Sequence, residues 1–213
     1  LGARTGGRKV TVYGQTEVTR DLMSARNGSN AKTIYEADAV VPVEFDGKHP
    51  KIRFKKDGQN CEIKCDFIIG ADGYHGVCRA SVPSEAIQEF ERVFPFAWLG
   101  VLADVPPASN ELIYVNHPRG FALCSMRSPT RSRYYLQCAV DEDVNAWSID
   151  QFWDEVRARL DAEAAARVTT GSALEMSVAR LRSFVAEPLR LGRMFLACDA
   201  GHIVPPTGAK GRT

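Results

Sequence analysis

Residues 120–140 read Gly-Phe-Ala-Leu-Cys-Ser-Met-Arg-Ser-Pro-Thr-Arg-Ser-Arg-Tyr-Tyr-Leu-Gln-Cys-Ala-Val, and this stretch decides the fold class. Its two halves, residues 120–126 and 132–140, are rich in the apolar and aromatic residues that favour strands. The Ser-Pro-Thr-Arg segment between them has the residue types of a tight turn. The pattern therefore predicts a β-hairpin that forms part of an antiparallel sheet.

The polar side chains of this hairpin are spaced as a strand requires for a shared face. Ser125 and Arg127 are two residues apart, as are Arg133 and Tyr135, so each pair is expected on one face of its strand. A hydroxyl, a guanidinium and a phenol could then converge on an anion such as a carboxylate. Tyr114, on the strand expected before the hairpin, adds a second phenol. Composition alone favours the alternative, a surface of solvated arginines beside half-buried tyrosines.

Outward from the hairpin, short strands and helices alternate without an internal repeat. The pattern predicts an α/β fold of α+β character with two lobes that divide near residue 88. The first lobe is expected at residues 1–88, and the second, with an antiparallel sheet, at residues 89–193. Residues 194–213 are expected to return to the first lobe. Helices are expected at residues 16–26, 148–160 and 162–168, the second opened by a capping box of Ser148 and Gln151. Strands are expected at residues 9–13, 33–35, 39–45, 51–54, 61–65, 67–69, 97–103, 112–116, 175–184 and 194–197.

Two of these strands deliver an aspartate to their carboxyl end. Residues 67–69 lead into Gly70-Ala71-Asp72-Gly73, and residues 194–197 lead into Cys198-Asp199. Ligands of open sheets bind at such ends, so the pair indicates a nucleotide site. His75 and Arg79 could add cationic donors to it. The alternatives are a solvated glycine-rich turn at Asp72 and a helix N-cap at Asp199.

Composition excludes several classes of protein. The chain has 213 residues, 45% hydrophobic and 25% charged, which is typical of a globular protein and not of a disordered one. Its formal net charge of +1 provides no field for nucleic acid or anionic lipid. The sequence contains neither the run of about 20 apolar residues that spans a membrane nor a secretion signal, so we expect a cytoplasmic protein. The six cysteines lack zinc-ligand spacing, and we expect no metal.

Four stretches together carry a resemblance to a known family. They are residues 12–18 (Val-Tyr-Gly-Gln-Thr-Glu-Val), 70–76 (Gly-Ala-Asp-Gly-Tyr-His-Gly), 116–125 (Asn-His-Pro-Arg-Gly-Phe-Ala-Leu-Cys-Ser) and 202–211 (His-Ile-Val-Pro-Pro-Thr-Gly-Ala-Lys-Gly). In this order the chain resembles the para-hydroxybenzoate hydroxylases, which are class A flavoprotein monooxygenases. The resemblance implies an FAD-binding lobe, a substrate lobe, and the NADPH- and O2-dependent hydroxylation of 4-hydroxybenzoate to 3,4-dihydroxybenzoate.

The resemblance also implies roles at the substrate. Ser125, Arg127 and Tyr135 would hold the carboxylate of a small aromatic substrate, in agreement with the anion cluster expected from the hairpin. Tyr114 would contact the substrate phenol and help to remove its proton. Two further catalytic residues would be Pro206, through its main-chain carbonyl at the substrate hydroxyl, and Thr207, which would face the flavin.

For the cofactors the implied positions are more widely spread. FAD would be contacted by Gln15, Asp72, Arg133 and Asp199. NADPH would be contacted by three cationic side chains, those of His75, Arg79 and Arg182. A homodimer is a further implication of the resemblance.

The chain also departs from the family pattern. The Gly-x-Gly-x-x-Gly segment that cradles the FAD pyrophosphate in this family would precede Leu1, and further helices would follow Thr213, so we expect a central portion of such an enzyme. Cys198 stands where the family usually has glycine, and Gly201 where it usually has alanine. Two alternatives stay open: a non-catalytic truncated homologue with a binding or assembly role, and a hydroxylase of a related hydroxybenzoate.

Overall fold

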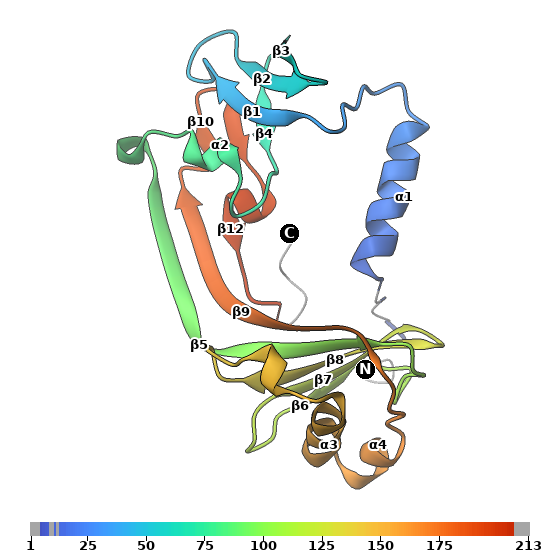
Figure 1. Ribbon diagram of the computed structural model, residues 1–213. Coiled ribbons are helices and arrows are strands. Elements are labelled where there is room, and N and C mark those ends of the chain that lie inside the picture. Colours follow the sequence, from blue (N-terminus) through green and yellow to red (C-terminus); the bar gives the residue numbers. More distant parts are fainter. Residues whose placement is uncertain (1–4, 9–10, 12, 207–213) are drawn as a thin grey trace. The chain divides into compact units, whose positions relative to one another are not determined.

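The structure is a computed structural model that describes residues 5–8, 11 and 13–206, and it divides into two compact units (Figure 1). Unit 1 comprises Phe94–Arg180 and the described residues up to Ala31. Unit 2 comprises Lys32–Val93 and the described residues from Leu181 onward. Both units mix helices with strands, which confirms the predicted fold class.

Unit 1 is built on an antiparallel sheet. The order of the strands is β9-β5-β8-β7-β6, and the hairpin expected from residues 120–140 is formed by β7 and β8. Ser128 pairs with Arg131, so the hairpin turns through Pro129 and Thr130. The strands of the sheet are β5 (Gln88–Ala103), β6 (Ile113–Val115), β7 (Ala122–Ser128), β8 (Arg131–Cys138) and β9 (Ala173–Glu187).

Helices cover one face of this sheet (Figure 1). α3 (Ile149–Arg159) and α4 (Ala162–Ala166) follow a short 3-10 turn, η3 (Val144–Ala146). The core between α3 and the sheet consists of alternate strand residues packed on the apolar stripe of the helix. Its largest fully buried members are Trp153, Tyr134, Phe152, Leu99, Leu136, Val101 and Val156. The opposite face of the sheet is therefore free of these helices.

The capping box predicted from the sequence begins α3. Ser148 Oγ accepts the Gln151 main-chain N–H at 3.1 Å, and Gln151 Oε1 accepts the Ser148 N–H at 2.9 Å. Ser148→Ala is expected to lower the free energy of unfolding by about 1 kcal/mol, because one N–H at the helix start loses its partner. Urea unfolding followed by circular dichroism measures this loss. Ser81→Ala at the end of another helix serves as a control, since Ser81 Oγ donates only to the exposed carbonyl of Val77.

One more helix, α1 (Gln15–Asn27), belongs to unit 1 and agrees with the helix expected at residues 16–26. The strand expected at residues 9–13 falls largely outside the described residues, and Thr11 and Tyr13, which are described, are not in a strand. None of the side chains of α1 is buried among the described residues.

Unit 2 contains two three-stranded sheets. The antiparallel meander is β1 (Asp38–Val43), β2 (Lys51–Lys56) and β3 (Gln59–Lys64). The second sheet has the order β10-β11-β4, with β4 (Ile68–Gly70), β10 (Arg190–Leu191) and β11 (Met194–Leu196). The remaining elements are α2 (Val77–Ala80), η2 (Ser84–Ala86), η4 (Cys198–Ala200) and β12 (His202–Ile203), which pairs with β9.

Two expectations about strands need correction. Residues 33–35 lie outside the strands, although Thr-Ile-Tyr has high β-propensity, which shows that propensity alone does not decide strand formation. β5 begins at Gln88 and not near residue 97; its first residues are mostly exposed and include Pro95, so they lack the buried apolar run by which the second half was predicted. No helix in the described part of the chain is long and apolar enough to cross a membrane.

Candidate functional site

A row of four residues crosses the helix-free face of the sheet in unit 1. Tyr114 pairs with Leu123, Leu123 with Tyr135, and Tyr135 with Gly100. Paired residues of neighbouring strands share a face, and strands lie about 4.8 Å apart, so the two tyrosines start about 10 Å from each other. The row therefore brings two phenols to one face of the sheet, two strands apart.

Ser125 and Arg133 form the next row on the same face. They are paired across β7 and β8, and Ser125 is buried at 4% exposure. The Arg133 guanidinium binds Glu175 of β9 in a fork, with distances from Nη1 to Oε2 of 3.0 Å and from Nη2 to Oε1 of 3.2 Å. This hydrogen-bonded guanidinium holds the pKa of Glu175 below its usual value. The structure thus gives Arg133 a carboxylate partner that the sequence analysis did not predict.

Arg127 lies at a β-bulge. The register of β7 and β8 shifts between Met126 and Ser128, so one residue of β7 has no partner there. The alternation that placed Arg127 on the face of Ser125 is interrupted at this point, and a shared carboxylate site stays a prediction. Among the described residues none forms a hydrogen bond or an ion pair with the Arg127 side chain.

Aromatic rings link the two ends of the first row. The Trp98 ring is stacked on Phe121 at 5.2 Å between centroids and lies 5.4 Å from Tyr135. Phe121 in turn lies 5.9 Å from Tyr114. Such contacts orient rings beyond the effect of simple burial. The face consequently carries a connected group of aromatic rings beside hydroxyl and guanidinium groups, the side-chain types that bind an aromatic anion.

Gly100 makes room for the Tyr135 ring. A Cβ built on Gly100 would lie 2.8 Å from Tyr135 Cε1 and 3.2 Å from Arg133 Nη2. The Arg133 guanidinium lies 5.1 Å from the centroid of the Tyr135 ring. The glycine is needed for this close approach of the ring to the backbone of β5, a requirement that the isolated sequence did not reveal.

In unit 2 the two strand-end aspartates are on neighbouring strands. β4 and β11 are parallel and paired, with Leu196 opposite Gly70, and the Ala197 N–H donates to the Gly70 carbonyl at 2.9 Å. The turns that carry Asp72 and Asp199 therefore leave the same edge of the sheet. This edge is where ligands of parallel sheets bind.

The two aspartates differ in their partners. Asp72 is exposed, and its Oδ2 accepts the main-chain N–H of Cys78, in the first turn of the short helix α2, at 2.8 Å, a contact that the sequence analysis did not predict. Asp199 lies in η4, is half-buried, and accepts no hydrogen bond from the described residues. Asp199 thus keeps all of its acceptor capacity for a ligand, whereas Asp72 has already used part of its own.

Two arginines near this edge are held by groups of unit 2. Arg79 donates from Nη1 to the Ala200 carbonyl at 3.0 Å and is paired with Glu89 at 2.9 Å. Its guanidinium lies over Tyr74 and over Phe184, with 4.7 and 4.5 Å to the ring centroids. Arg182 is paired with Glu91 at 2.8 Å and also lies over Tyr74, at 4.5 Å. The exposed His75 packs edge-on against the Tyr74 ring at 4.9 Å between centroids.

The departures at Cys198 and Gly201 have a geometric basis. Cys198 has φ of +54°, a left-handed conformation that glycine adopts without strain. At Gly201 an added Cβ would lie 2.6 Å from Leu189 Cδ2 and 3.3 Å from the Leu196 carbonyl oxygen. Cys198 therefore occupies a glycine-type position, and Leu189 fills the space that alanine would need.

The other predicted positions are less defined. Gln15 is exposed at the first turn of α1, and Pro206 is exposed at the end of the described chain. Thr207 lies outside the described residues. Among the described residues no three side chains of His, Cys, Asp or Glu gather as metal ligands.

Comparisons with known proteins agree with these features. The family described as FAD binding domain matches residues 1–212. The chain is 59% identical over 211 residues to p-hydroxybenzoate hydroxylase of Acinetobacter baylyi, covering 99% of this chain and 52% of that protein. The chain belongs to the family described as FAD binding domain, and the similarity to a para-hydroxybenzoate hydroxylase expected from its motifs is confirmed.

Solved structures share the fold at low identity. The p-nitrophenol 4-monooxygenase of Pseudomonas putida superposes with a TM-score of 0.74 at 15% identity, covering 93% of this chain and 50% of that one. A complex of aklavinone-11 hydroxylase with FAD and aklavinone gives 0.71 at 18% identity, covering 93% and 38%. The chain thus spans about half the length of the Acinetobacter baylyi protein, and 50% and 38% of the lengths of these two structures.

Proposed function

We propose that the protein containing this chain hydroxylates 4-hydroxybenzoate to 3,4-dihydroxybenzoate with FAD, NADPH and O2. The observation that carries this proposal is the row of Tyr114 and Tyr135 on the helix-free face of the sheet, beside Ser125 and Arg133. The identity of 59% to a p-hydroxybenzoate hydroxylase supports the choice of substrate. A para-hydroxylated benzoate has its phenol and its carboxylate at opposite ends, as the row requires.

At one end of the row, the substrate carboxylate would be bound by Ser125, Arg127 and Tyr135. A buried hydroxyl and a guanidinium are strong donors to a carboxylate, and a low local dielectric strengthens them. Arg133 is already paired with Glu175, which leaves Arg127 as the guanidinium for the substrate.

At the other end, Tyr114 would contact the substrate phenol and help to remove its proton by accepting a hydrogen bond from it. A free phenol has a pKa of about 10, so it is protonated at neutral pH, whereas its phenolate is richer in electrons and reacts faster with an electrophilic oxygen. The Pro206 carbonyl would bind the same hydroxyl, and Thr207 would face the flavin. The contribution of the chain is to orient the ring and to move this proton.

For FAD, the residues present at the edge of β4 and β11 fit a dinucleotide. Asp199 has free acceptor oxygens, and the Gly70 and Gly76 turn is closely packed, since a Cβ at either would lie within 2.4 Å of another side chain. We assign Asp72, Asp199 and Gln15 to FAD, with Arg133 near its ring system. When bound, FAD supplies the activation of oxygen, which no side chain can provide.

NADPH is assigned to His75, Arg79 and Arg182. Cationic side chains suit a phosphorylated nicotinamide donor. The ion pairs of Arg79 and Arg182 with Glu89 and Glu91 mean that these guanidinium groups would exchange or share a carboxylate partner when they bind a phosphate. His75 is exposed and has no such partner among the described residues.

The product of the complete gene tests this function. We expect the purified protein to retain FAD, measured by its absorbance, and to oxidise NADPH faster when 4-hydroxybenzoate is added, with 3,4-dihydroxybenzoate formed in equal amount. The 2- and 3-hydroxy isomers are the controls for substrate choice. A protein that retains flavin but oxidises NADPH at the same rate with and without every isomer would favour the non-catalytic homologue.

A further inference from the structure

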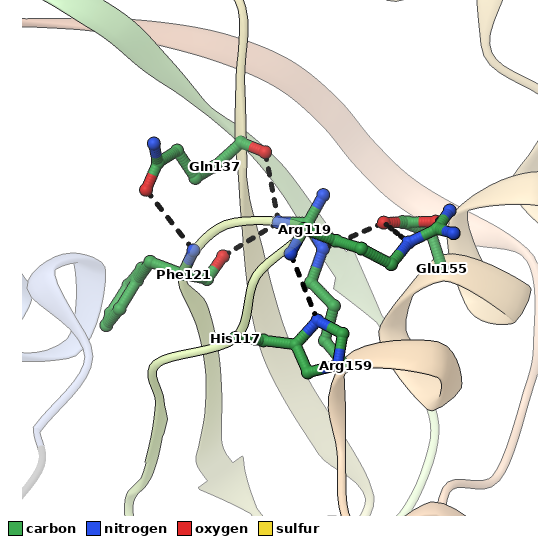
Figure 2. Close-up of polar contacts among 6 residues, drawn as sticks. All are labelled: His117, Arg119, Phe121, Gln137, Glu155 and Arg159. Carbon is green, nitrogen blue, oxygen red and sulfur yellow. Dashed lines mark hydrogen bonds and ion pairs between the residues drawn. The ribbon is translucent and has the colours of Figure 1, made fainter.

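The turn between β6 and β7 is held by a buried arginine of α3 (Figure 2). Arg159 is 6% exposed, and its Nη1 donates to the carbonyl oxygens of Phe121 at 2.9 Å and Gln137 at 3.0 Å. Its Nε donates to Glu155 Oε1 at 2.9 Å, and the same oxygen accepts Arg119 Nε at 3.0 Å. The buried charge is therefore held by one carboxylate and two main-chain carbonyls.

The main chain of this turn is shaped to accept the arginine. Gly120 has φ of +106°, and a Cβ there would lie 3.3 Å from Arg159 Nη1 and 3.3 Å from Gln137 Cβ. The Gly120 N–H donates to the His117 carbonyl at 2.8 Å, and the Phe121 N–H donates to Gln137 Oε1 at 3.2 Å. Glycine is thus required by both the backbone angle and the space that the guanidinium occupies.

The residue held at the end of the turn is a neighbour of the candidate site. The Phe121 ring lies 5.2 Å from Trp98 in a stacked arrangement and 5.9 Å from Tyr114. Hydrogen bonds hold both the N–H and the carbonyl of Phe121, so they also fix the position of its Cα and the direction of its Cα–Cβ bond. A shift of this ring would change the surface against which Tyr114 packs.

A buried ion pair contributes less to stability than an apolar pair that fills the same volume. Removing Glu155 and Arg159 from water costs free energy that an apolar pair of similar size would not lose, and such pairs are retained in some proteins because they select one arrangement. The hydrogen bond from Arg119, together with Arg159, holds the pKa of Glu155 below its usual value, so the carboxylate stays charged. Of the two acceptors of Arg159 outside its own helix, Gln137 belongs to β8 and Phe121 directly precedes β7.

We propose that Arg159 is a positioning residue for Tyr114. With Glu155 and Gln137 it fixes the main chain at Phe121 and thereby sets Tyr114 at the phenol end of the substrate. This proposal rests on the proposed function, because it takes Tyr114 as the partner of the substrate phenol.

The test uses the complete flavin-loaded protein and two ligands, 4-hydroxybenzoate and benzoate. In Arg159→Met we expect the Kd for 4-hydroxybenzoate to rise about tenfold, the size of one lost hydrogen bond, with little change for benzoate, which lacks the phenol. The pH at which bound 4-hydroxybenzoate loses its phenolic proton, followed by absorbance, is expected to rise. Arg159→Lys, which keeps a charge and a donor, is expected to recover part of both.

Two further variants separate positioning from folding. Arg157→Met is the matched control, because Arg157 is on the same helix and its Nη2 donates to the Val168 carbonyl at 3.1 Å, away from the turn; both ligands are expected to bind it as they bind the parent. Phe121→Leu removes the ring and keeps its main-chain hydrogen bonds. It is expected to show the same selective loss of 4-hydroxybenzoate, and it decides the question if Arg159→Met does not fold.

The outcomes distinguish this proposal from the function on which it rests. Folded Arg159→Met and Phe121→Leu proteins that bind both ligands as the parent does, or that lose both equally, would overturn the positioning role. A parent protein that binds neither ligand would instead refute the proposed function, and the positioning role with it.

Discussion

The proposed hydroxylation of 4-hydroxybenzoate is expected to fall about a hundredfold in Gly100→Ala, because a displacement of a binding group by about 1 Å can have an effect of this size. The added Cβ would lie 2.8 Å from Tyr135 Cε1 and 3.0 Å from Tyr135 Cδ1, which no real side chain tolerates. The ring must therefore move off the backbone of β5, and the Arg133 guanidinium that packs on it must move as well. The substrate carboxylate would lose its intended partner.

The same substitution is expected to change stability little. Tyr135 is half-buried, so its ring can shift toward the open face without creating a cavity. Steady-state kinetics and thermal unfolding measure the two effects separately. Gly28→Ala is the matched control, because a Cβ there meets only the Ala25 and Ser24 carbonyls at 3.6 and 3.7 Å. Normal turnover of Gly100→Ala would show that the position of Tyr135 does not matter for the reaction.

Trp153→Ala is expected to have the largest effect on stability. Trp153 is 1% exposed, packs edge-on against Tyr134 at 5.2 Å and Phe152 at 5.5 Å, and donates from Nε1 to the Gly171 carbonyl at 2.8 Å. Removal of a buried tryptophan costs about 3–5 kcal/mol, and the Gly171 carbonyl loses its donor in addition. This is a large share of the roughly 5–15 kcal/mol that stabilises a typical domain.

Denaturant unfolding of the purified protein measures this loss. Trp147→Ala serves as the control, because Trp147 is only half-buried and donates to the Glu142 carboxylate at the end of η3. Trp153→Phe is expected to lie between the parent and Trp153→Ala, since it keeps a ring in the core but not the hydrogen bond. Equal losses in Trp147→Ala and Trp153→Ala would contradict the assignment of Trp153 to the centre of the core.

Local signals in the sequence were sufficient for most elements of the fold. The capping box was predicted because Ser148 and Gln151 are three residues apart, a spacing at which each side chain can accept the main-chain N–H of the other residue. The hairpin turn was predicted because Pro129 lies between two apolar runs. The exposed first half of β5 was missed, because it lacks a buried apolar run and its strand character depends on the rest of the fold. Residues 33–35 were assigned to a strand from β-propensity alone, and they lie outside the strands of the structure.

The site was only partly predictable. The pairing of Ser125 with Arg133 follows from strand alternation, but the bulge before Ser128 interrupts that rule without a sequence signal. Glu175 is 42 residues from Arg133, so no local pattern could join them. Arg159 could have been suspected, because it continues the apolar helical spacing of Phe152 and Val156, where an arginine is unusual.

The contact between Leu189 and Gly201 has a consequence for how this protein can diverge. The two positions share one volume, so a larger residue at 201 is tolerated only after Leu189 becomes shorter or turns away. The effects of substitutions at these two positions are therefore expected to be non-additive. A larger residue at position 201 is expected to be destabilising while Leu189 is present, and a shorter residue at position 189 is expected to be destabilising while Gly201 is present. Cys198 is under no such constraint, because its strain lies in the backbone, and it can be exchanged for glycine without any change at a second position.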